Sequence, residues 1–238
     1  MSPEPEMFSP AWYDEYYRRA EASPTHAKFC QQVYGRDLCQ HGMMDMQELN
    51  LLISMLQIGG NFLEVGCGNG RVSEYIQRYA SGHLLGLDAS KVAIQQAKAR
   101  CKGNKGLDFA CLDAAKDRLP AGPYDGILLI DSIYFLGEYA PFLRSLIPLL
   151  KPRGRILLSF FQTREKGDPK TILHADHTFI AQALDAANLR WVAYDFTANA
   201  HKHWLANYEA AEALKAEFLQ EGNQFLYEAR HAENVPFK

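Results

Sequence analysis

The sequence lacks three features that would each point to a class of function. It has no excess of basic charge: 25 Lys and Arg against 28 Asp and Glu give a formal net charge of -3, so no basic face collects nucleic-acid phosphates. It has no apolar run approaching ~18 residues, the length of a membrane span, and no leader-like start. We therefore expect a small-molecule partner, with no nucleic acid and no membrane.

The sequence also lacks a cysteine pattern that would predict disulfide bonds. The five cysteines are odd in number, show no Cys-x-x-Cys spacing and lie mostly in apolar segments, where a reduced thiol behaves as a small hydrophobe. This pattern favours a reducing, cytoplasmic setting. With 238 residues, 47% of them hydrophobic, the chain is long enough for one compact domain with a small accessory lobe, acting as a monomer or a homodimer.

The order of apolar patterns predicts an α/β fold. Helical patterns cover residues 11–22, 25–34 and 44–56, and short apolar runs then alternate with helical patterns, which is typical of a parallel sheet with helices on both faces. We predict strands at 61–66, 83–88, 107–112, 125–131, 155–161 and 190–196. Helices are expected at 71–80, 90–102, 139–150 and 176–188. Right-handed crossovers then bring all strand carboxyl ends to one edge of a doubly wound, mostly parallel sheet.

This pattern divides the chain into three parts. Residues 1–60 are expected to form an N-terminal helical part, which a resemblance described below implies is a lid, residues 61–198 the Rossmann-like core, and residues 199–238 a helical extension. Within the extension, residues 225–231 fit either another helix or a short terminal strand.

A glycine-rich turn follows the first predicted strand. Residues 61–70 read Asn-Phe-Leu-Glu-Val-Gly-Cys-Gly-Asn-Gly, and a helical pattern starts after them. Because glycine has no Cβ, Gly66, Gly68 and Gly70 mark a place where a ligand lies against the main chain. Asp88 follows Gly68 by 20 residues, the spacing at which a carboxylate accepts both hydroxyls of a ribose. The turn therefore predicts a nucleoside ligand; the alternative is a tight turn without one.

The residues around Glu64 indicate which class of nucleoside ligand is expected. A dinucleotide fingerprint is Gly-x-Gly-x-x-Gly, whereas here Glu64 precedes Gly-x-Gly-x-Gly, which resembles the first motif of the class I S-adenosylmethionine-dependent methyltransferases. Further stretches resemble that class in the same order, at residues 87–90, 111–114, 124–131 and 150–154. The resemblance covers residues 61 to 161. It implies S-adenosyl-L-methionine as cofactor and S-adenosyl-L-homocysteine as product.

The same resemblance implies roles for individual residues. The methionine side of the cofactor would meet Glu64, Gly66, Cys67, Gly68 and Gly70; the ribose would meet Asp88 and Ala89, and the adenine Asp113 and Ala114. Asp131 and Tyr134 would lie where the methyl donor meets the acceptor, at the spacing of an acid three residues before an aromatic in amino-group methyltransferases. The alternatives are a turn cap at Asp113 and a strand end with a core tyrosine at Tyr134.

Residues 29–42 carry a second resemblance. They are similar to the segment before the core of glycine- and sarcosine-type N-methyltransferases, in a tyrosine, a glycine and a later His-Gly. This implies a lid over the cofactor, with His41 as proton acceptor or substrate contact. Tyr17 and Tyr34 are the aromatic rings that we expect against a sulfonium or a substrate ammonium, rather than in core packing alone.

Four later histidines offer chelating spacings. His174 and His177 form a His-x-x-His pair, and His201 and His203 a His-x-His pair, but neither has a third ligand at a recognisable spacing. We therefore predict surface or substrate-pocket histidines and no metal site.

The residues together predict a small-molecule methyltransferase. Its methyl group would move by in-line displacement under the closed lid, to an amine nitrogen in preference to oxygen. Three alternatives stay open: cyclisation of S-adenosylmethionine that releases methylthioadenosine, a catalytically silent cofactor-binding module, and a nicotinamide-dependent reductase.

Overall fold

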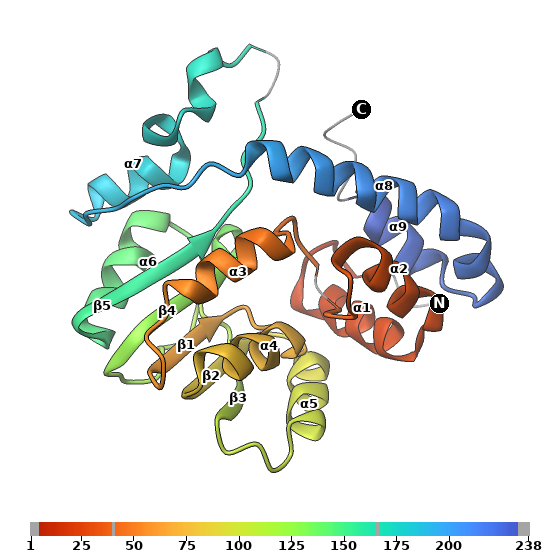
Figure 1. Cartoon of the computed structure of the whole chain (residues 1–238), viewed down its shortest axis with the longest axis horizontal. Helices are drawn as coiled ribbons and strands as arrows, with labels where there is room; N and C mark the ends of the chain where they lie inside the picture. The colour runs from red at the N-terminus through yellow and green to blue at the C-terminus, as the bar shows by residue number, and fades with distance from the viewer. Residues whose placement is uncertain (1–4, 40, 165–166, 233–238) are drawn as a thin grey trace.

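The protein is built on a sheet of five parallel strands. The structure is a computed structural model that describes residues 5–39, 41–164 and 167–232. The strands are β1 (Asn61–Val65), β2 (His83–Asp88), β3 (Leu107–Cys111), β4 (Tyr124–Ile130) and β5 (Leu150–Ser159), in the order β3-β2-β1-β4-β5 (Figure 1). β1 pairs with β2 on one side and β4 on the other, so the strand order reverses at β1, where doubly wound sheets bind ligands at the carboxyl edge.

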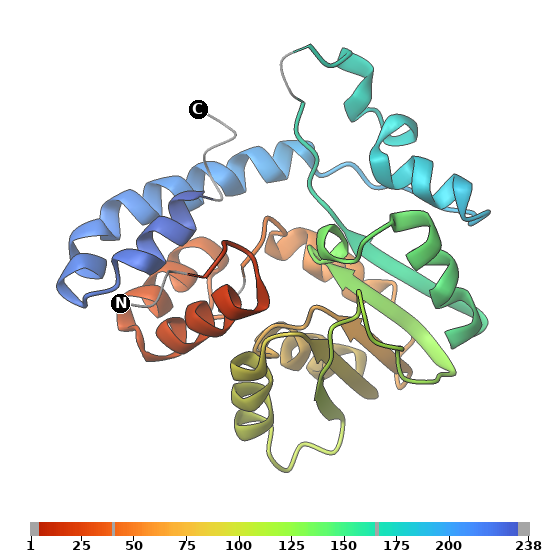
Figure 2. The same cartoon turned by 180° about the vertical axis from the view of Figure 1, so that it is seen from behind.

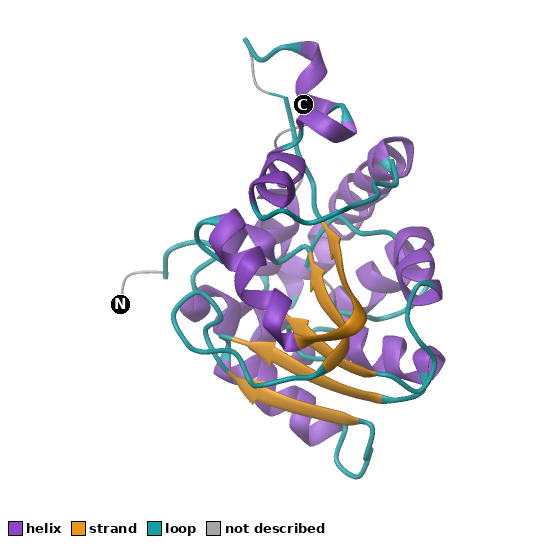
Figure 3. Cartoon of the chain, turned by 90° about the vertical axis from the view of Figure 1, so that its left-hand side faces the viewer, coloured by secondary structure: helices purple, strands orange, loops and turns teal. Residues whose placement is uncertain are grey.

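Helices cover both faces of this sheet (Figure 3). The helices α3 (Met46–Ser54), α4 (Arg71–Ala80) and α5 (Lys91–Arg100) share one apolar cluster with Phe62 and Leu128. On the other face, α6 (Tyr139–Leu146) and α7 (Phe179–Ala186) pack with Leu63 and Ile127. Consecutive strand residues thus point to opposite faces, which explains why these strands read as continuous apolar runs.

The two ends of the chain form one helical body beside the sheet (Figures 1 and 2). The helices are α1 (Pro10–Ala22), α2 (Pro24–Tyr34), α8 (Thr197–Gln220) and α9 (Gln224–Ala232). Their apolar cluster includes Trp12, Phe29, Leu214, Phe218 and Leu226. The first part of the predicted lid therefore packs against the predicted extension, whereas α3 packs on the sheet.

Serine caps explain where the first two helices begin. Ser9 Oγ accepts a hydrogen bond from Trp12 N–H at the start of α1, and Ser23 Oγ accepts one from His26 N–H at the start of α2. α2 ends at Gly35, whose φ of 70° is the left-handed conformation common after helices. None of the helices that the structure describes combines the length and apolar character needed to span a membrane.

The structure confirms the predicted fold class but not the last predicted strand. The first five predicted strands are present, but the predicted strand at 190–196 is wrong: this segment is irregular, and Val192 and Tyr194 are exposed. A β-prone segment becomes a strand only beside a partner, and in the described part of the chain the sheet ends at β5. Residues 225–231 lie in the helix α9. Short 3-10 turns fill the connections: η1 (Ile133–Phe135), η2 (Ile147–Leu149), η3 (Lys170–Leu173) and η4 (Ala175–His177).

The helical body gives a stability prediction. Phe218 is fully buried in its cluster, while the next residue, Leu219, is 47% exposed. We expect Phe218→Ala to lower the free energy of unfolding by about 3–5 kcal/mol, because it removes a packed ring and leaves a cavity. Leu219→Ala should change it by less than about 0.5 kcal/mol. Urea unfolding followed by circular dichroism measures both, and equal effects would contradict a shared core.

Candidate functional site

The glycine turn between β1 and α4 holds its shape through the neighbouring strands. The N–H groups of Gly66 and Cys67 both donate to Leu87 O, at 2.8 and 2.9 Å. A Cβ on Gly66 would lie 2.5 Å from Ser132 Cβ, and one on Gly68 would lie 2.2 Å from Tyr17 Oη. Both glycines also have positive φ, at 83° and 54°. Side chains are therefore excluded here by space and by conformation.

Asp88 links this turn to the next one. Its Oδ2 accepts from Gly68 N–H at 2.8 Å, and its Oδ1 accepts from Ser90 N–H at 2.8 Å. Burial raises the pKa of Asp88, although these two hydrogen bonds oppose the shift. Each carboxylate oxygen has a second lone pair, so Asp88 can still accept hydroxyl groups.

Glu64 is a buried acid under the turn. It is 1% exposed, and Ser73 Oγ donates to its Oε2 at 2.5 Å. Burial raises the pKa of Glu64 to about 7; the hydrogen bond from Ser73 lowers it and the charge of Asp88 raises it.

Asp131 joins the end of β4 to the lid segment. Its Oδ2 accepts from Met43 N–H at 2.8 Å and from Met44 N–H at 2.9 Å, while its own N–H donates to Ser159 Oγ at 3.1 Å. Burial raises the pKa of Asp131. Its φ of 46° is unusual for a residue other than glycine, and such strain is typical of functional positions.

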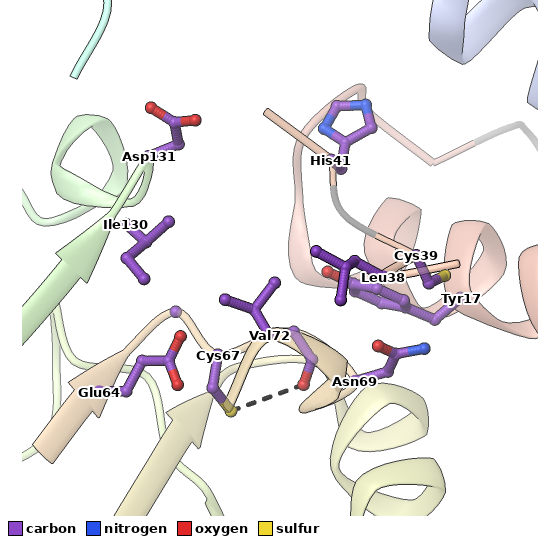
Figure 4. Close-up of a pocket in the computed structure, with 12 residues that line it drawn as sticks. Tyr17, Leu38, Cys39, His41, Glu64, Cys67, Asn69, Val72, Ile130 and Asp131 are labelled. Atoms are coloured by element: carbon purple, nitrogen blue, oxygen red, sulfur yellow. Dashed lines mark hydrogen bonds between the residues drawn. The ribbon is translucent and has the colours of Figure 1, made fainter. Parts of the chain in front are cut away.

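A cavity lies between the sheet edge and the helical body. Its empty volume is about 390 Å³, part of which is open to solvent. Figure 4 shows Glu64 and Asp131 on the strand side and Tyr17 and His41 on the helical side. Of the described lining residues, none is a lysine or an arginine, and the full set is Tyr17, Leu38, Cys39, His41, Glu64, Gly66, Cys67, Gly68, Asn69, Val72, Ile130 and Asp131.

Tyr17 lies directly over the glycine turn. It is 7% exposed, with its hydroxyl against Gly68. Burial, followed by the charge of Asp88, raises the pKa of Tyr17 well above its usual value, so the hydroxyl stays protonated. α1 holds it there because Gln96 Nε2 donates to Tyr17 O at 2.9 Å.

His41 is surrounded by aromatic rings. Its ring centroid is 4.9 Å from that of Tyr16, 5.4 Å from Trp12 and 5.7 Å from Tyr13. Burial, followed by the charge of Arg230, lowers the pKa of His41 well below its usual value. The imidazole is therefore neutral at pH 7 and a weak proton acceptor.

The other two predicted tyrosines are not among the cavity-lining residues. Tyr134 Oη donates to Phe161 O at 3.3 Å and accepts from Phe161 N–H, so its hydroxyl binds the chain after β5. Tyr34 Oη donates to Gly42 O at 3.3 Å, and its ring lies 4.9 Å from the ring of His203. Both contacts are structural, and the roles predicted for these tyrosines stay predictions.

Asp113 makes the contacts of a turn. Its carboxylate accepts from Ala115 N–H at 3.1 Å and pairs with Lys116 Nζ at 2.7 Å. The bond from Lys116 lowers the pKa of Asp113. Ala89, Gly70, Asp113 and Ala114 do not line the cavity, and their predicted cofactor contacts stay predictions.

Two residues of this region were missed by the sequence reasoning. Asn69 is 2% exposed, and its Nδ2 has no hydrogen-bond partner in the described part of the chain; its place between two predicted site glycines was a usable signal. Glu48 lies in the first turn of α3, behind the cap Asp45. Burial, then the charges of Asp131 and Asp45, raises the pKa of Glu48 to about 8. Nothing in the sequence placed it near Asp131.

Comparison with known proteins agrees with this geometry. Residues 63–156 match the family model described as a methyltransferase domain, a range that contains the end of β1, the glycine turn, Asp88 and Asp131. The matched residues form a methyltransferase domain of the class I S-adenosylmethionine-dependent type. The resemblance predicted from the glycine motif is thereby confirmed.

Curated relatives of the methyltransferase domain act on different acceptors. The chain is 26% identical over 140 residues to a phosphoethanolamine N-methyltransferase of Triticum aestivum, covering 58% of this chain and 28% of that one. It is 33% identical over 99 residues to a ubiquinone biosynthesis O-methyltransferase of Caulobacter vibrioides, covering 40% and 38%. The chain therefore spans well under half the length of these relatives.

Solved structures share the fold. Phosphoethanolamine N-methyltransferase 2 of Haemonchus contortus, solved with S-adenosyl-L-methionine, has a TM-score of 0.69 at 16% identity, covering 92% of this chain and 54% of that one. The [4+2]-cyclase SpnF has a TM-score of 0.63 at 21% identity, covering 80% and 72%. At these identities the likeness concerns the fold of the methyltransferase domain.

The pKa of Glu64 gives a pH prediction for the ligand-free protein. The folded chain holds this proton up to about pH 7, whereas the unfolded chain releases it near pH 4.5. The contribution of Glu64 to the free energy of unfolding should therefore fall by about 3 kcal/mol as the pH rises from 4.5 to 7. Glu64→Gln keeps an acceptor for Ser73 and should remove this fall, while the exposed Glu209→Gln should not. Urea unfolding at both pH values tests this; an unchanged pH slope in Glu64→Gln would contradict it.

Proposed function

We propose that this protein transfers the methyl group of S-adenosyl-L-methionine to the nitrogen of a small amine. The observation that carries the proposal is the charge of the cavity. Glu64 and Asp131 line it, and the described lining residues include no lysine or arginine. Two further acids are coupled to lining residues: Asp88 accepts a hydrogen bond from Gly68, and the charge of Asp131 acts on Glu48. Such a site favours cations, and both a sulfonium and a substrate ammonium are cations.

The residues present fit the cofactor. The exposed Gly66 would offer its carbonyl to the methionine ammonium, and Asp88 its free lone pairs to the ribose hydroxyls. The unpaired Nδ2 of Asn69 is a buried donor that a bound carboxylate would satisfy. Bound S-adenosyl-L-methionine supplies a methyl group on a positively charged sulfur. Asp113 and Ala114 stay the proposed adenine contacts.

The acids next to the lid would handle the acceptor. An alkylammonium must lose a proton before its nitrogen can attack, and the raised pKa of Glu48, about 8, suits a group that takes it up. Asp131 would hold the ammonium, with Tyr17 and the neutral His41 as aromatic contacts. Tyr134 and Tyr34 would act through the backbone they bind.

The lid would supply alignment. The segment before α3 is tied to Asp131 by two amides, so it can close the cavity over the reactants and exclude water. Holding donor and acceptor in line is worth roughly 7 to 11 kcal/mol of a bimolecular barrier. In-line methyl transfer needs little further catalysis.

A second candidate is a reaction of S-adenosylmethionine without methyl transfer, such as cyclisation that releases methylthioadenosine. The cyclase SpnF shares the fold of this chain, and one fold can support different reactions. This likeness supports the second candidate. A silent cofactor-binding module would bind the cofactor without turnover.

Product analysis separates these functions. The full chain is incubated with S-adenosyl-L-methionine alone and then with mixed amines, phenols and acids, and all products are read by mass spectrometry. We expect S-adenosyl-L-homocysteine and a methylated amine. Asp88→Ala should lose measurable cofactor binding by calorimetry, because unpaired ribose hydroxyls cost roughly 1 to 3 kcal/mol each. Methylthioadenosine, or binding without any product, would refute methyl transfer.

Glu48 gives a separate prediction for the acceptor. Glu48→Gln should lower kcat/KM for amine acceptors about 100-fold or more, because glutamine cannot take up the ammonium proton and general-base catalysis contributes roughly 10²–10⁴-fold. The dissociation constant for S-adenosyl-L-methionine should stay within about twofold. The exposed Glu209→Gln is the matched control and should change neither value. An unchanged kcat/KM in Glu48→Gln would exclude Glu48 as the proton acceptor.

A further inference from the structure

Three metal-ligating side chains meet in the segment between β5 and α7. His174, Asp176 and His177 each offer one ligand atom, and these atoms lie within 4.8 Å of one another. His177 Nε2 is already 3.7 Å from Asp176 Oδ2, and the two imidazole rings are stacked with centroids 6.0 Å apart. Figure 1 shows this segment in teal above α7 and away from α1, α2 and α9 of the helical body.

Backbone hydrogen bonds fix the three positions. His174 N–H donates to Thr171 O at 2.9 Å, and His177 N–H donates to His174 O at 2.8 Å, which keeps the ligands on consecutive tight turns. Gln162 holds the segment from both sides: its Nε2 donates to Ile172 O at 3.1 Å, and its Oε1 accepts from Phe179 N–H at 3.0 Å. The cluster therefore sits on a braced stretch of chain.

One hydrogen bond also selects the free nitrogen of His177. Its Nδ1 is 3.1 Å from Thr171 O, and since a carbonyl can only accept, Nδ1 must carry the proton. Nε2 then keeps its lone pair, and this is the nitrogen that faces Asp176. A backbone carbonyl on the second ring nitrogen is the usual partner of a metal-bound histidine.

We propose that His174, Asp176 and His177 bind a divalent transition-metal ion, with Zn²⁺ as the best match. Two imidazole nitrogens and one carboxylate oxygen suit Zn²⁺, whereas Mg²⁺ and Ca²⁺ prefer oxygen alone. Tetrahedral Zn²⁺ requires neighbouring ligand atoms about 3.3 Å apart. The side chain of Asp176 is 70% exposed, so its carboxylate has room to move toward the two imidazoles, while His177 keeps its hydrogen bond to Thr171 O. The fourth position stays open to water or another ligand.

This proposal revises the sequence prediction of no metal site. The His-x-x-His spacing was noted there, but the third ligand, Asp176, lies between the histidines and joins them only through the η4 turn. The pair His201 and His203 behaves differently: His201 is exposed and His203 is 6% exposed, because residues two apart on α8 do not share a face. None of the three proposed ligands lines the cavity, so the proposed metal site is separate from it.

Calorimetric titration of the full chain with ZnCl₂ tests the proposal. We expect one Zn²⁺ per chain, with affinity reduced at least about tenfold in His174→Gln, in His177→Gln and in Asp176→Asn. His201→Gln is the matched control, an exposed histidine outside the cluster, and should bind as the parent does. Circular dichroism checks that each variant is folded, and visible absorption of added Co²⁺ reports tetrahedral coordination.

Two outcomes would overturn the proposal. One is Zn²⁺ binding by the double variant His174→Gln and His177→Gln equal to that of the parent, which would assign binding to other residues and leave the cluster a hydrogen-bonded surface turn. The other is MgCl₂ binding at this site as tightly as ZnCl₂, which would contradict a nitrogen-ligated site. Methyltransferase activity enters neither readout, so the result does not depend on the proposed function.

Discussion

Two amides on one buried carboxylate hold the sheet and the lid segment together. Asp131 accepts from Met43 N–H and Met44 N–H, and its backbone N–H is bound to Ser159 at the end of β5. The next residue, Ser132, donates from Oγ to Val65 O at 2.6 Å, which ties β4 to the end of β1. Hydrogen bonds to a charged acceptor are stronger than neutral ones. These bonds therefore join the sheet edge to the segment on the other side of the cavity.

The same arrangement gathers acids that repel one another. Burial raises the pKa values of Glu64, Asp88, Asp131 and Glu48, with the charges of neighbouring acids as further causes for Glu64 and Glu48. Removing carboxylates from water is costly unless hydrogen bonds or a cation compensate. Asp88 and Asp131 have backbone amides, and Glu64 has Ser73, but in the described part of the chain no hydrogen bond reaches the side chain of Glu48. A bound cation would stabilise the ionised forms of all four, and this is the physical link between the fold and the proposed chemistry.

Part of the site could be read from the sequence because its contacts depend on strand register. Parallel pairing of β1 with β2 places Glu64 opposite Gly86, and the following residues then bring Gly68 to Asp88. The glycine turn, the acid at Asp88 and the 20-residue spacing were sufficient to predict this contact. Asp113 and Tyr134 followed the same pattern of strand ends, yet their polar groups bond to Lys116 and to Phe161, because a strand end fixes a residue's position and not the partner of its side chain.

Local sequence determined the five strands, the covering helices and the glycine turn, since each depends on apolar periodicity and on residues within one βα unit. Contacts between distant segments were decided only by the tertiary structure. The packing of Trp12 with Phe218, the seating of Tyr17 on Gly68 and the placement of Glu48 near Asp131 all join residues far apart in the chain. Segment 190–196 shows the same limit, because strand formation requires a partner edge that local propensity does not supply. The sequence pattern determined the secondary structure, whereas the acidic cavity depends on how the sheet and the helical body pack together.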